Sequence, residues 1–156
     1  MTCRCGGACL TALGNRIDAL SGEAKADGWR WVGLTLDSHV NNVVADTARS
    51  GQSAAYHIDT HPHVHSFVKN AGLGFAIPYL FNGQPHDYIP DFIIRVNGDA
   101  DRYLILETKS YDPLRDVKTQ AAHRWADAVN ADGAFGQWSY AVVDRVSDVS
   151  GAINTA

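Results

Sequence analysis

The 156-residue chain has no apolar run that approaches the ~20 residues needed to cross a bilayer. Its N-terminus lacks the charged-then-apolar pattern of a signal peptide, so we expect a cytoplasmic protein with no membrane partner. The chain also has no G-x-x-x-x-G-K-[ST] loop, the backbone cradle that holds phosphates in ATP-driven motors. Neither ATPase nor helicase activity is therefore expected of these residues.

An excess of positive charge is absent as well. The formal net charge is −4, which gives no support to binding nucleic acid through a broad basic surface. A local basic groove stays compatible with that value. The apolar fraction of 46% is that of a folded globule rather than a disordered chain. The length fits one domain with a real core.

Cysteine is scarce and confined to one end of the chain. Cys3, Cys5 and Cys9 all lie in the first nine residues, and no second cysteine pair follows. A closed zinc site needs four ligands, so the fourth would have to be His39 or a histidine further along. The alternative is an irregular leader in which the cysteines have no ligand role.

A second group of possible metal ligands is the segment H-I-D-T-H-P-H-V-H, with His57, His61, His63 and His65. The last three alternate and would share one face only if the segment were extended, and Pro62 opposes a continuous helix. The pattern is compatible with zinc binding and with a solvated loop of unrelated histidines.

The pattern of apolar residues predicts a single α/β domain over residues 38–146, with an irregular lead-in over residues 1–37 and a tail over residues 147–156. Within the N-terminal part we expect only short elements, at Leu10–Leu20, Trp29–Leu36 and Asn41–Ala45. From Asp46 to Val68 the pattern is helical, interrupted by Pro62. A strand over Phe75–Phe81 follows, and Asn82-Gly83 forms a turn.

The most informative stretch comes next and predicts a β-hairpin, with strands in Tyr88–Val96 and Tyr103–Tyr111 joined by a connection that begins with Asn-Gly. Side chains alternate along a strand, so Glu107 and Lys109 share one face. Folding the hairpin about residue 99 or 100 places Asp91 opposite Lys109 or Glu107. Unpaired charges are costly to bury in so apolar a strand, which indicates a functional site.

After the hairpin, Asp112-Pro113 is a typical helix start, and Gly133 a typical helix end. The apolar stripe of this helix comprises Leu114, Val117, Ala121, Trp125, Ala128 and Val129. A last strand is expected at Trp138–Val143. Parallel pairing of that strand through the crossover helix gives a mixed sheet with helices on its faces.

The order helix, three strands, helix, strand, with P-D before one strand and E-x-K at the end of the next, resembles the PD-(D/E)xK nuclease superfamily. The segments V-K-N-A-G-L-G-F-A-I-P-Y, Y-I-P-D-F, L-E-T-K and W-A-D-A-V-N followed by G-A-F-G-Q-W look like the C-terminal nuclease region of type III restriction enzyme restriction subunits. The resemblance covers about residues 38 to 144. It implies a restriction-endonuclease-like fold with an αβββαβ core.

The resemblance also implies a function, that of a magnesium-dependent endonuclease which hydrolyses DNA phosphodiester bonds, with Mn²⁺ as a substitute cofactor. Asp91 and Glu107 would bind the metal together with the backbone carbonyl of Thr108, and Lys109 would act on the attacking water. These oxygen ligands are the ones that Mg²⁺ prefers, and a lysine beside the ion can orient water and stabilise charge. Neighbouring Asp, Glu and Lys side chains are also ordinary structural pairs on strands.

Two departures from the family are visible. The family carries an acidic residue in the helix before the hairpin, where this chain has Ser50 and Gly51, and Asp46 is the nearest substitute. Larger family proteins also carry an ATP-driven motor, which these residues lack. The resemblance therefore implies ATP, a motor region and a modification methyltransferase subunit only as partners outside this chain.

Three basic residues of the helix after the hairpin, Arg115, Lys118 and Arg124, lie off its apolar stripe. They are candidate contacts to the phosphates of double-stranded DNA, or else part of a solvated face. A second reading of the whole chain follows from the missing carboxylate at Gly51. On that reading the domain keeps the nuclease fold and binds DNA or a partner subunit without cutting.

Overall fold

The computed structural model describes residues 49–70, 74–108 and 111–156, with the side chains of residues 49–52 left aside. These residues form a mixed α/β structure. Its elements in chain order are α2 (Arg49–Asp59), β1 (Val64–Lys69), β2 (Ile77–Phe81), β3 (Gln84–Tyr88), β4 (Phe92–Val96), β5 (Arg102–Thr108), α3 (Arg115–Asp132), β6 (Gln137–Val143), a 3₁₀ turn (Val146–Asp148) and α4 (Val149–Thr155).

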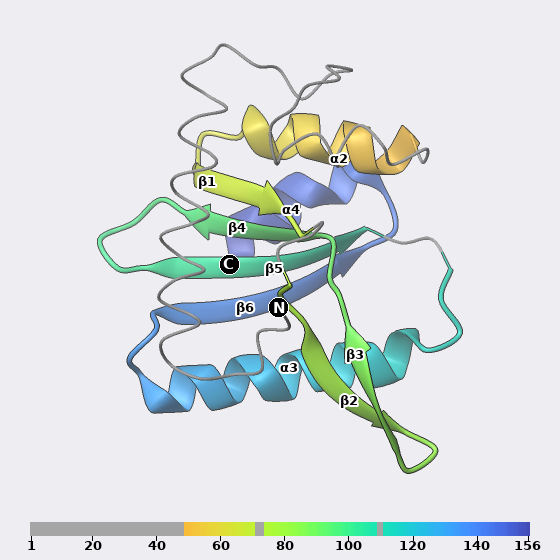
Figure 1. Ribbon diagram of the computed structural model, residues 1–156. Helices are drawn as coiled ribbons and strands as arrows, with labels where there is room; N and C mark the ends of the chain where they lie inside the picture. Colours follow the sequence, from red (N-terminus) through yellow and green to blue (C-terminus); the bar gives the residue numbers. More distant parts are fainter. Residues whose placement is uncertain (1–48, 71–73, 109–110) are drawn as a thin grey trace.

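The main sheet has four strands in the order β1-β4-β5-β6. The β1–β4 and β4–β5 pairs are antiparallel, whereas β6 runs parallel to β5 after the crossover through α3. Helix α3 covers one face of the sheet, and α2 and α4 cover the other (Figure 1). The predicted mixed sheet with helices on its faces is therefore confirmed.

Strands β4 and β5 are apolar along nearly their whole length because both of their faces are covered. Ile93 and Ile105 pack with the buried residues of α3, whereas Ile94 and Leu104 pack with those of α2 and α4. In the α3 cluster, the ring of Trp138 from β6 stacks on Tyr103 at 4.6 Å between centroids. These two layers fix the central hairpin on which the candidate site is built.

Helix α3 begins at Arg115, two residues after Pro113, the expected first helical position, and its N-cap is Leu114 and not Asp112. Asp112 lies just before the helix and accepts a hydrogen bond from Leu114 N–H at 2.8 Å. The helix ends at Gly133, whose φ of 74° is the left-handed conformation that favours glycine. The predicted stripe was wrong at Ala128, which is exposed. Ala122 and Ala126 are buried instead. They lie four residues apart, beside Ala121, Trp125 and Val129 on the buried face of the helix.

The helical pattern expected as far as Val68 was wrong, since residues 64–69 form the edge strand β1. Val64, Phe67 and Val68 have helical spacing in the sequence. In the strand, an irregularity between Val64 and Ser66 shifts the alternation, so Val64 and Phe67 pack in the cluster with α2 and α4, whereas Val68 packs in the cluster with α3. Pro62 opposes helix, and Asn97 N–H donates to the carbonyl of His63 at 2.8 Å, which starts the pairing of this segment with the end of β4.

The turn at Asn82-Gly83 is confirmed, and both residues have positive φ, 51° and 74°. It joins β2 to β3 in a separate two-stranded ribbon that lies outside the main sheet (Figure 1). The core antiparallel strands are consequently β1, β4 and β5, whereas the sequence had suggested Phe75–Phe81 as the first of the three.

The expected tail over residues 147–156 forms α4, and Val149 and Ile153 are fully buried against α2 and the sheet. The sequence pattern did not predict this buried helix, because so short a segment has only two apolar residues, Val149 and Ile153, on its buried face. The elements expected at Leu10–Leu20, Trp29–Leu36 and Asn41–Ala45 lie outside the described residues.

Candidate active site

Asp91 and Glu107 lie beside each other where β4 begins and β5 ends. The pairing of Phe92 with Leu106 extends to put Asp91 across from Glu107, the second of the two positions that the sequence allowed. Asp91 N–H donates a hydrogen bond to Glu107 Oε2 at 3.2 Å. The hairpin therefore brings these two predicted site residues together.

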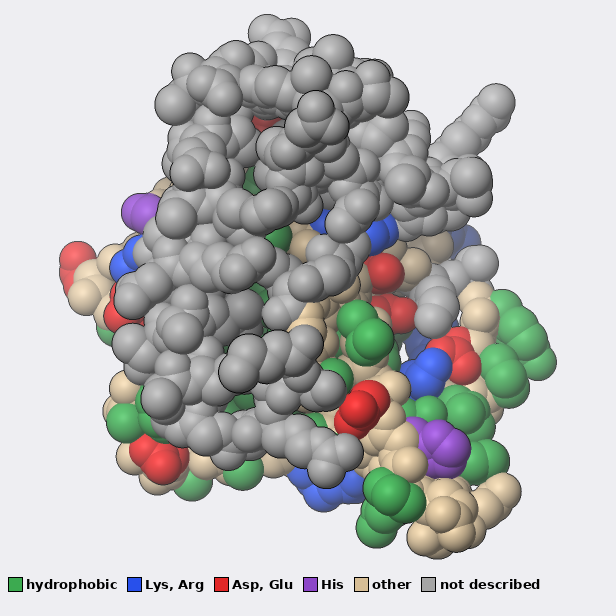
Figure 2. Space-filling view, viewed as in Figure 1, with side chains coloured by type: hydrophobic (Ala, Val, Ile, Leu, Met, Phe, Trp, Pro, Cys, Tyr) green, Lys and Arg blue, Asp and Glu red, His purple; other side chains and the backbone are tan. Residues whose placement is uncertain are grey.

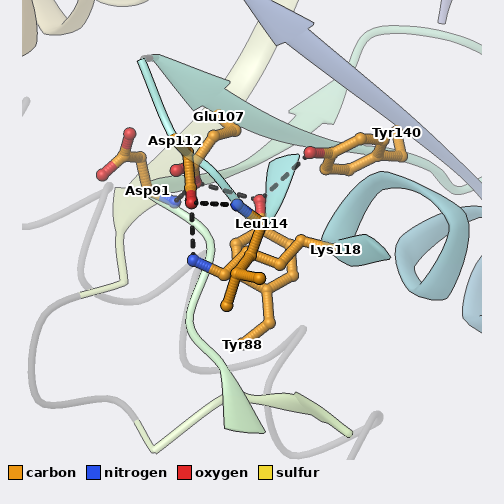
Figure 3. A network of polar contacts seen from close by, with 7 residues as sticks. All are labelled: Tyr88, Asp91, Glu107, Asp112, Leu114, Lys118 and Tyr140. Atoms are coloured by element: carbon orange, nitrogen blue, oxygen red, sulfur yellow. Dashed lines mark hydrogen bonds and ion pairs between the residues drawn. The ribbon is translucent and has the colours of Figure 1, made fainter. Parts of the chain in front are cut away.

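The Glu107 side chain is buried, with 5% of its surface exposed. Its Oε2 also accepts a hydrogen bond from the hydroxyl of Tyr88 at 2.9 Å. The Tyr88 hydroxyl in turn lies 3.2 Å from that of Tyr140 on β6 (Figure 3). A carboxylate at this depth is expected to be hydrogen-bonded, because burying it without donors would be costly.

The carboxylate of Asp91 is directed toward Thr108 and not toward Glu107. Its Oδ2 accepts two hydrogen bonds from Thr108, one from the backbone N–H and one from the hydroxyl, both at 2.9 Å. In Figure 3 it points away from the carboxylate of Glu107. Both Asp91 and Thr108 are thus at the site, while the metal role of the Thr108 carbonyl and the sharing of one ion by the two carboxylates remain predictions.

Lys109, the predicted catalytic lysine, lies outside the described residues. The departure at Ser50 and Gly51 falls in the first turn of α2, where side chains are not described, and Asp46 precedes that helix. Gly51 thus lies in the helix where the resemblance implies an acidic residue.

A small pocket adjoins Glu107 on the side of α3. Its volume of about 10 Å³ is close to the room that one water molecule occupies. Lys118 and Asp112 meet in it, with Nζ and Oδ2 2.7 Å apart and side chains only 20% and 10% exposed. The lining residues are Tyr88, Glu107, Asp112, Arg115, Lys118, Tyr140 and Val142.

Two of the three basic residues proposed to contact DNA are held by carboxylates. Lys118 pairs with Asp112, and Arg115 makes a two-pronged pair with Asp144 at 2.7 and 3.1 Å. Arg124 is exposed on α3. On the described part of the face in Figure 2, acidic and basic side chains are interspersed, so no patch of one sign is gathered there. DNA contact by these residues stays a prediction.

The two tyrosine hydroxyls near Glu107 remain protonated at ordinary pH. Burial raises the pKa of Tyr88 well above its usual value, and the neighbouring Glu107 carboxylate raises it further. Burial also raises the pKa of Tyr140. Both residues therefore act as O–H donors and not as bases.

The histidine segment is split between elements. His57 is in the last turn of α2, and His65 is exposed on β1. The rings of His61 and His63 lie edge to face, 5.4 Å apart, and His61 Nδ1 accepts the backbone N–H of His63 at 3.2 Å. Partial burial lowers the pKa of His61, and the proximity of His63 lowers it further.

Among residues 49–70, 74–108 and 111–156 there is no group of three or more His, Cys, Asp or Glu side chains placed to hold a metal ion. The four histidines are therefore not gathered around one metal position in the described part of the chain, and zinc binding by them stays a prediction. Cys3, Cys5, Cys9 and His39 lie outside the described residues.

Magnesium is less demanding, because it keeps several waters and usually takes only one or two protein carboxylates. Asp91 and Glu107 are adjacent residues that each carry a carboxylate, which fits that donor chemistry, although the two carboxylates point apart in this structure. The second oxygen of Asp91, Oδ1, has no hydrogen-bond partner among the described residues. The residues present therefore fit a hard divalent cation better than they fit zinc.

Sequence reasoning did not identify Tyr88, Tyr140 and Asp112 as parts of the site. A signal for Tyr88 exists in Y-I-P-D, which puts an aromatic hydroxyl three residues before Asp91. Nothing local marks Tyr140, which reaches the site only because β6 pairs with β5. Asp112 and Lys118 are six residues apart, which is not a helical spacing of three or four. They form an ion pair because the backbone turns at Leu114, just before the helix begins.

No protein-family model, no curated protein and no solved structure matches this chain significantly. Within the described residues no helix has the length and apolarity required to pass through a membrane.

Proposed function

We propose that this chain is a magnesium-dependent DNA endonuclease module of the PD-(D/E)xK type, similar to the nuclease region of type III restriction subunits. One observation supports this proposal most directly. Asp91 and Glu107 are joined by a 3.2 Å hydrogen bond at the edge where β4 begins and β5 ends. The arrangement helix, three antiparallel strands, crossover helix and parallel strand agrees with the αβββαβ core that the resemblance implies.

In the proposed reaction, Asp91 and Glu107 hold Mg²⁺, or Mn²⁺ in its place, with the Thr108 carbonyl as a further oxygen ligand. When bound, the ion would lower the pKa of a coordinated water and neutralise the negative charge that develops on the phosphate. Lys109 orients the attacking water and stabilises the negative charge that develops. Tyr88 and the Asp91 N–H keep the Glu107 carboxylate in place.

The substrate of this proposal is double-stranded DNA in a cytoplasmic restriction system. A motor region that uses ATP and a modification methyltransferase subunit would be partners outside these residues. Arg124, and Arg115 and Lys118 once released from their carboxylates, are the proposed phosphate contacts. Because the formal net charge of the chain is −4, we expect moderate affinity by this module alone.

A second candidate is a module that keeps this fold and binds DNA or a partner subunit without cutting. The engagement of Asp91 Oδ2 by two donors of Thr108 favours it, since those bonds satisfy that oxygen without any metal. Gly51 in place of the family's acid favours it too. Cleavage activity separates the two candidates.

The test is cleavage of double-stranded DNA by the full chain with Mg²⁺, with EDTA, and with Mg²⁺ after Lys109→Ala. We expect cleavage only with Mg²⁺, and a loss of about 100-fold in Lys109→Ala, the usual scale for a group that acts on the attacking water. Equal cleavage by Lys109→Ala would remove this lysine from the mechanism. No cleavage by the unmodified chain, with DNA binding intact, would establish the non-cutting candidate.

A further inference from the structure

Tyr88 lies at the junction between the β2–β3 ribbon and the candidate site. It ends β3, is 3% exposed, and comes three residues before Asp91. Its ring packs in the cluster of residues under α3, with Lys118 Nζ 5.8 Å from the ring centroid. Only its hydroxyl meets Glu107, as Figure 3 shows. The side chain is therefore held rigidly by packing while its polar end faces a predicted metal ligand.

The directions of the hydrogen bonds follow from the proton count. A tyrosine hydroxyl has one proton to donate, and an ionised carboxylate can only accept. Tyr88 therefore gives its proton to Glu107 Oε2, at 2.9 Å. Tyr140 must then be the donor in the 3.2 Å contact between the two hydroxyls. The result is a series of hydrogen bonds from Tyr140 on β6 through Tyr88 to Glu107, in which each hydrogen bond strengthens the next.

The same oxygen of Glu107 also accepts the N–H of Asp91 at 3.2 Å. Both donors come from one four-residue segment, Tyr88 to Asp91, so the segment that carries Asp91 is tied to Glu107 at two points. Two donors of fixed direction on one oxygen restrict rotation of the carboxylate. Outer partners of this kind commonly orient metal ligands in proteins.

We propose that Tyr88 is a positioning residue whose hydroxyl, supported by Tyr140, holds the Glu107 carboxylate in the orientation that binds a divalent cation. This inference rests on the proposed function, because it takes Glu107 as a metal ligand. Tyr88 itself touches neither the metal nor the DNA in this account. Its removal should weaken metal binding without removing the chemistry.

The first test is calorimetric titration of Mn²⁺ into the full chain and into Tyr88→Phe, which deletes the hydroxyl and keeps the buried ring. We expect Mn²⁺ affinity to fall by about 10-fold or more, the usual range for loss of an outer partner of a metal ligand. Tyr79→Phe is the matched control, because Tyr79 is a buried tyrosine of the same cluster on β2. We expect its affinity to equal that of the unmodified chain.

The second test separates positioning from simple loss of structure. In Tyr88→Phe the cleavage rate should reach that of the unmodified chain when Mg²⁺ is raised, with only the half-saturating concentration shifted. A rate that falls in the same proportion at every Mg²⁺ concentration would mean that the hydroxyl does not act through metal binding, and would overturn the inference. Unchanged Mn²⁺ affinity in a folded Tyr88→Phe would overturn it as well.

Tyr140→Phe provides a second variant should Tyr88→Phe fail to fold, since Tyr140 is only partly buried. Deleting its hydroxyl removes the donor behind Tyr88, and we expect a smaller loss of Mn²⁺ affinity, about threefold, below the range for a direct outer partner. Affinity equal to the unmodified chain would then overturn the inference. Absence of Mn²⁺ binding by the unmodified chain would overturn the proposed metal site and this inference together, whereas unchanged variants of a chain that binds and cuts would overturn only the latter.

Discussion

Glu107→Gln should abolish DNA cleavage while leaving the domain folded. Glutamine keeps an oxygen at the end of the side chain, so it can accept the hydrogen bonds that Tyr88 and the Asp91 N–H now give to Oε2. The change removes the negative charge with little change in volume, and it replaces the other carboxylate oxygen by an amide NH₂ group. Since a bound metal contributes several kcal/mol to the transition state, we expect a loss of roughly 1,000-fold in rate.

Asp91→Asn should act in the same way, because the asparagine oxygen can still accept both bonds from Thr108. We expect the free energy of unfolding of each variant to lie within about 1.5 kcal/mol of that of the unmodified chain, since the hydrogen bonds named above can still form. Asp127→Asn is the matched control, an exposed acid on α3 whose loss should leave the rate unchanged. Chemical denaturation and cleavage rates measured side by side provide the test, and activity that survives in either variant removes that residue from the mechanism.

Ile153→Ala should destabilise the domain by about 2–5 kcal/mol, the usual cost of truncating a fully buried isoleucine. Ile153 is 1% exposed and packs in the cluster that contains Ala54, Ala55 and Ile58 of α2. The removed atoms leave a cavity between α4 and α2, which the backbone of two helices cannot easily close. A loss of this size is a large part of the stability of a small domain.

The comparison for Ile153→Ala is Asn154→Ala on the same helix, where the side chain is exposed. That change should alter the free energy of unfolding by less than about 0.5 kcal/mol. Urea denaturation of the three proteins gives both values. If Ile153→Ala were as stable as Asn154→Ala, α4 would not be part of the core, and the sequence-based description of residues 147–156 as a tail would be right.

The central hairpin was predictable because its signals are local. The apolar runs of β4 and β5 are separated by a short Asn-Gly-containing connection, and alternation alone limits the partner of Asp91 to two positions. The C-terminal end of α3 was as clear, since a left-handed glycine is a local feature, whereas the start was predicted two residues too early. Such features need no knowledge of the remainder of the chain.

The errors arose where tertiary contacts decide the structure. Val64, Phe67 and Val68 have helical spacing, and only pairing with β4, with an irregularity after Val64, makes their segment a strand. The seven residues of α4 are held by buried contacts at Val149 and Ile153 rather than by helix propensity. Within the site, Tyr140 meets Tyr88 across 52 positions of sequence, and the turn of Asp91 Oδ2 toward Thr108 depends on side-chain rotation that alternation does not specify.

The most direct measurement is the anomalous scattering of Mn²⁺ in crystals of the chain. The proposed function predicts one ion with an oxygen of Asp91 and an oxygen of Glu107 both within about 2.2 Å, close to the distances of small hard cations. This requires the Asp91 carboxylate to leave its present direction toward Thr108. An ion bound at the histidines instead, or an Asp91 carboxylate that stays on Thr108 with no ion beside Glu107, would contradict the account.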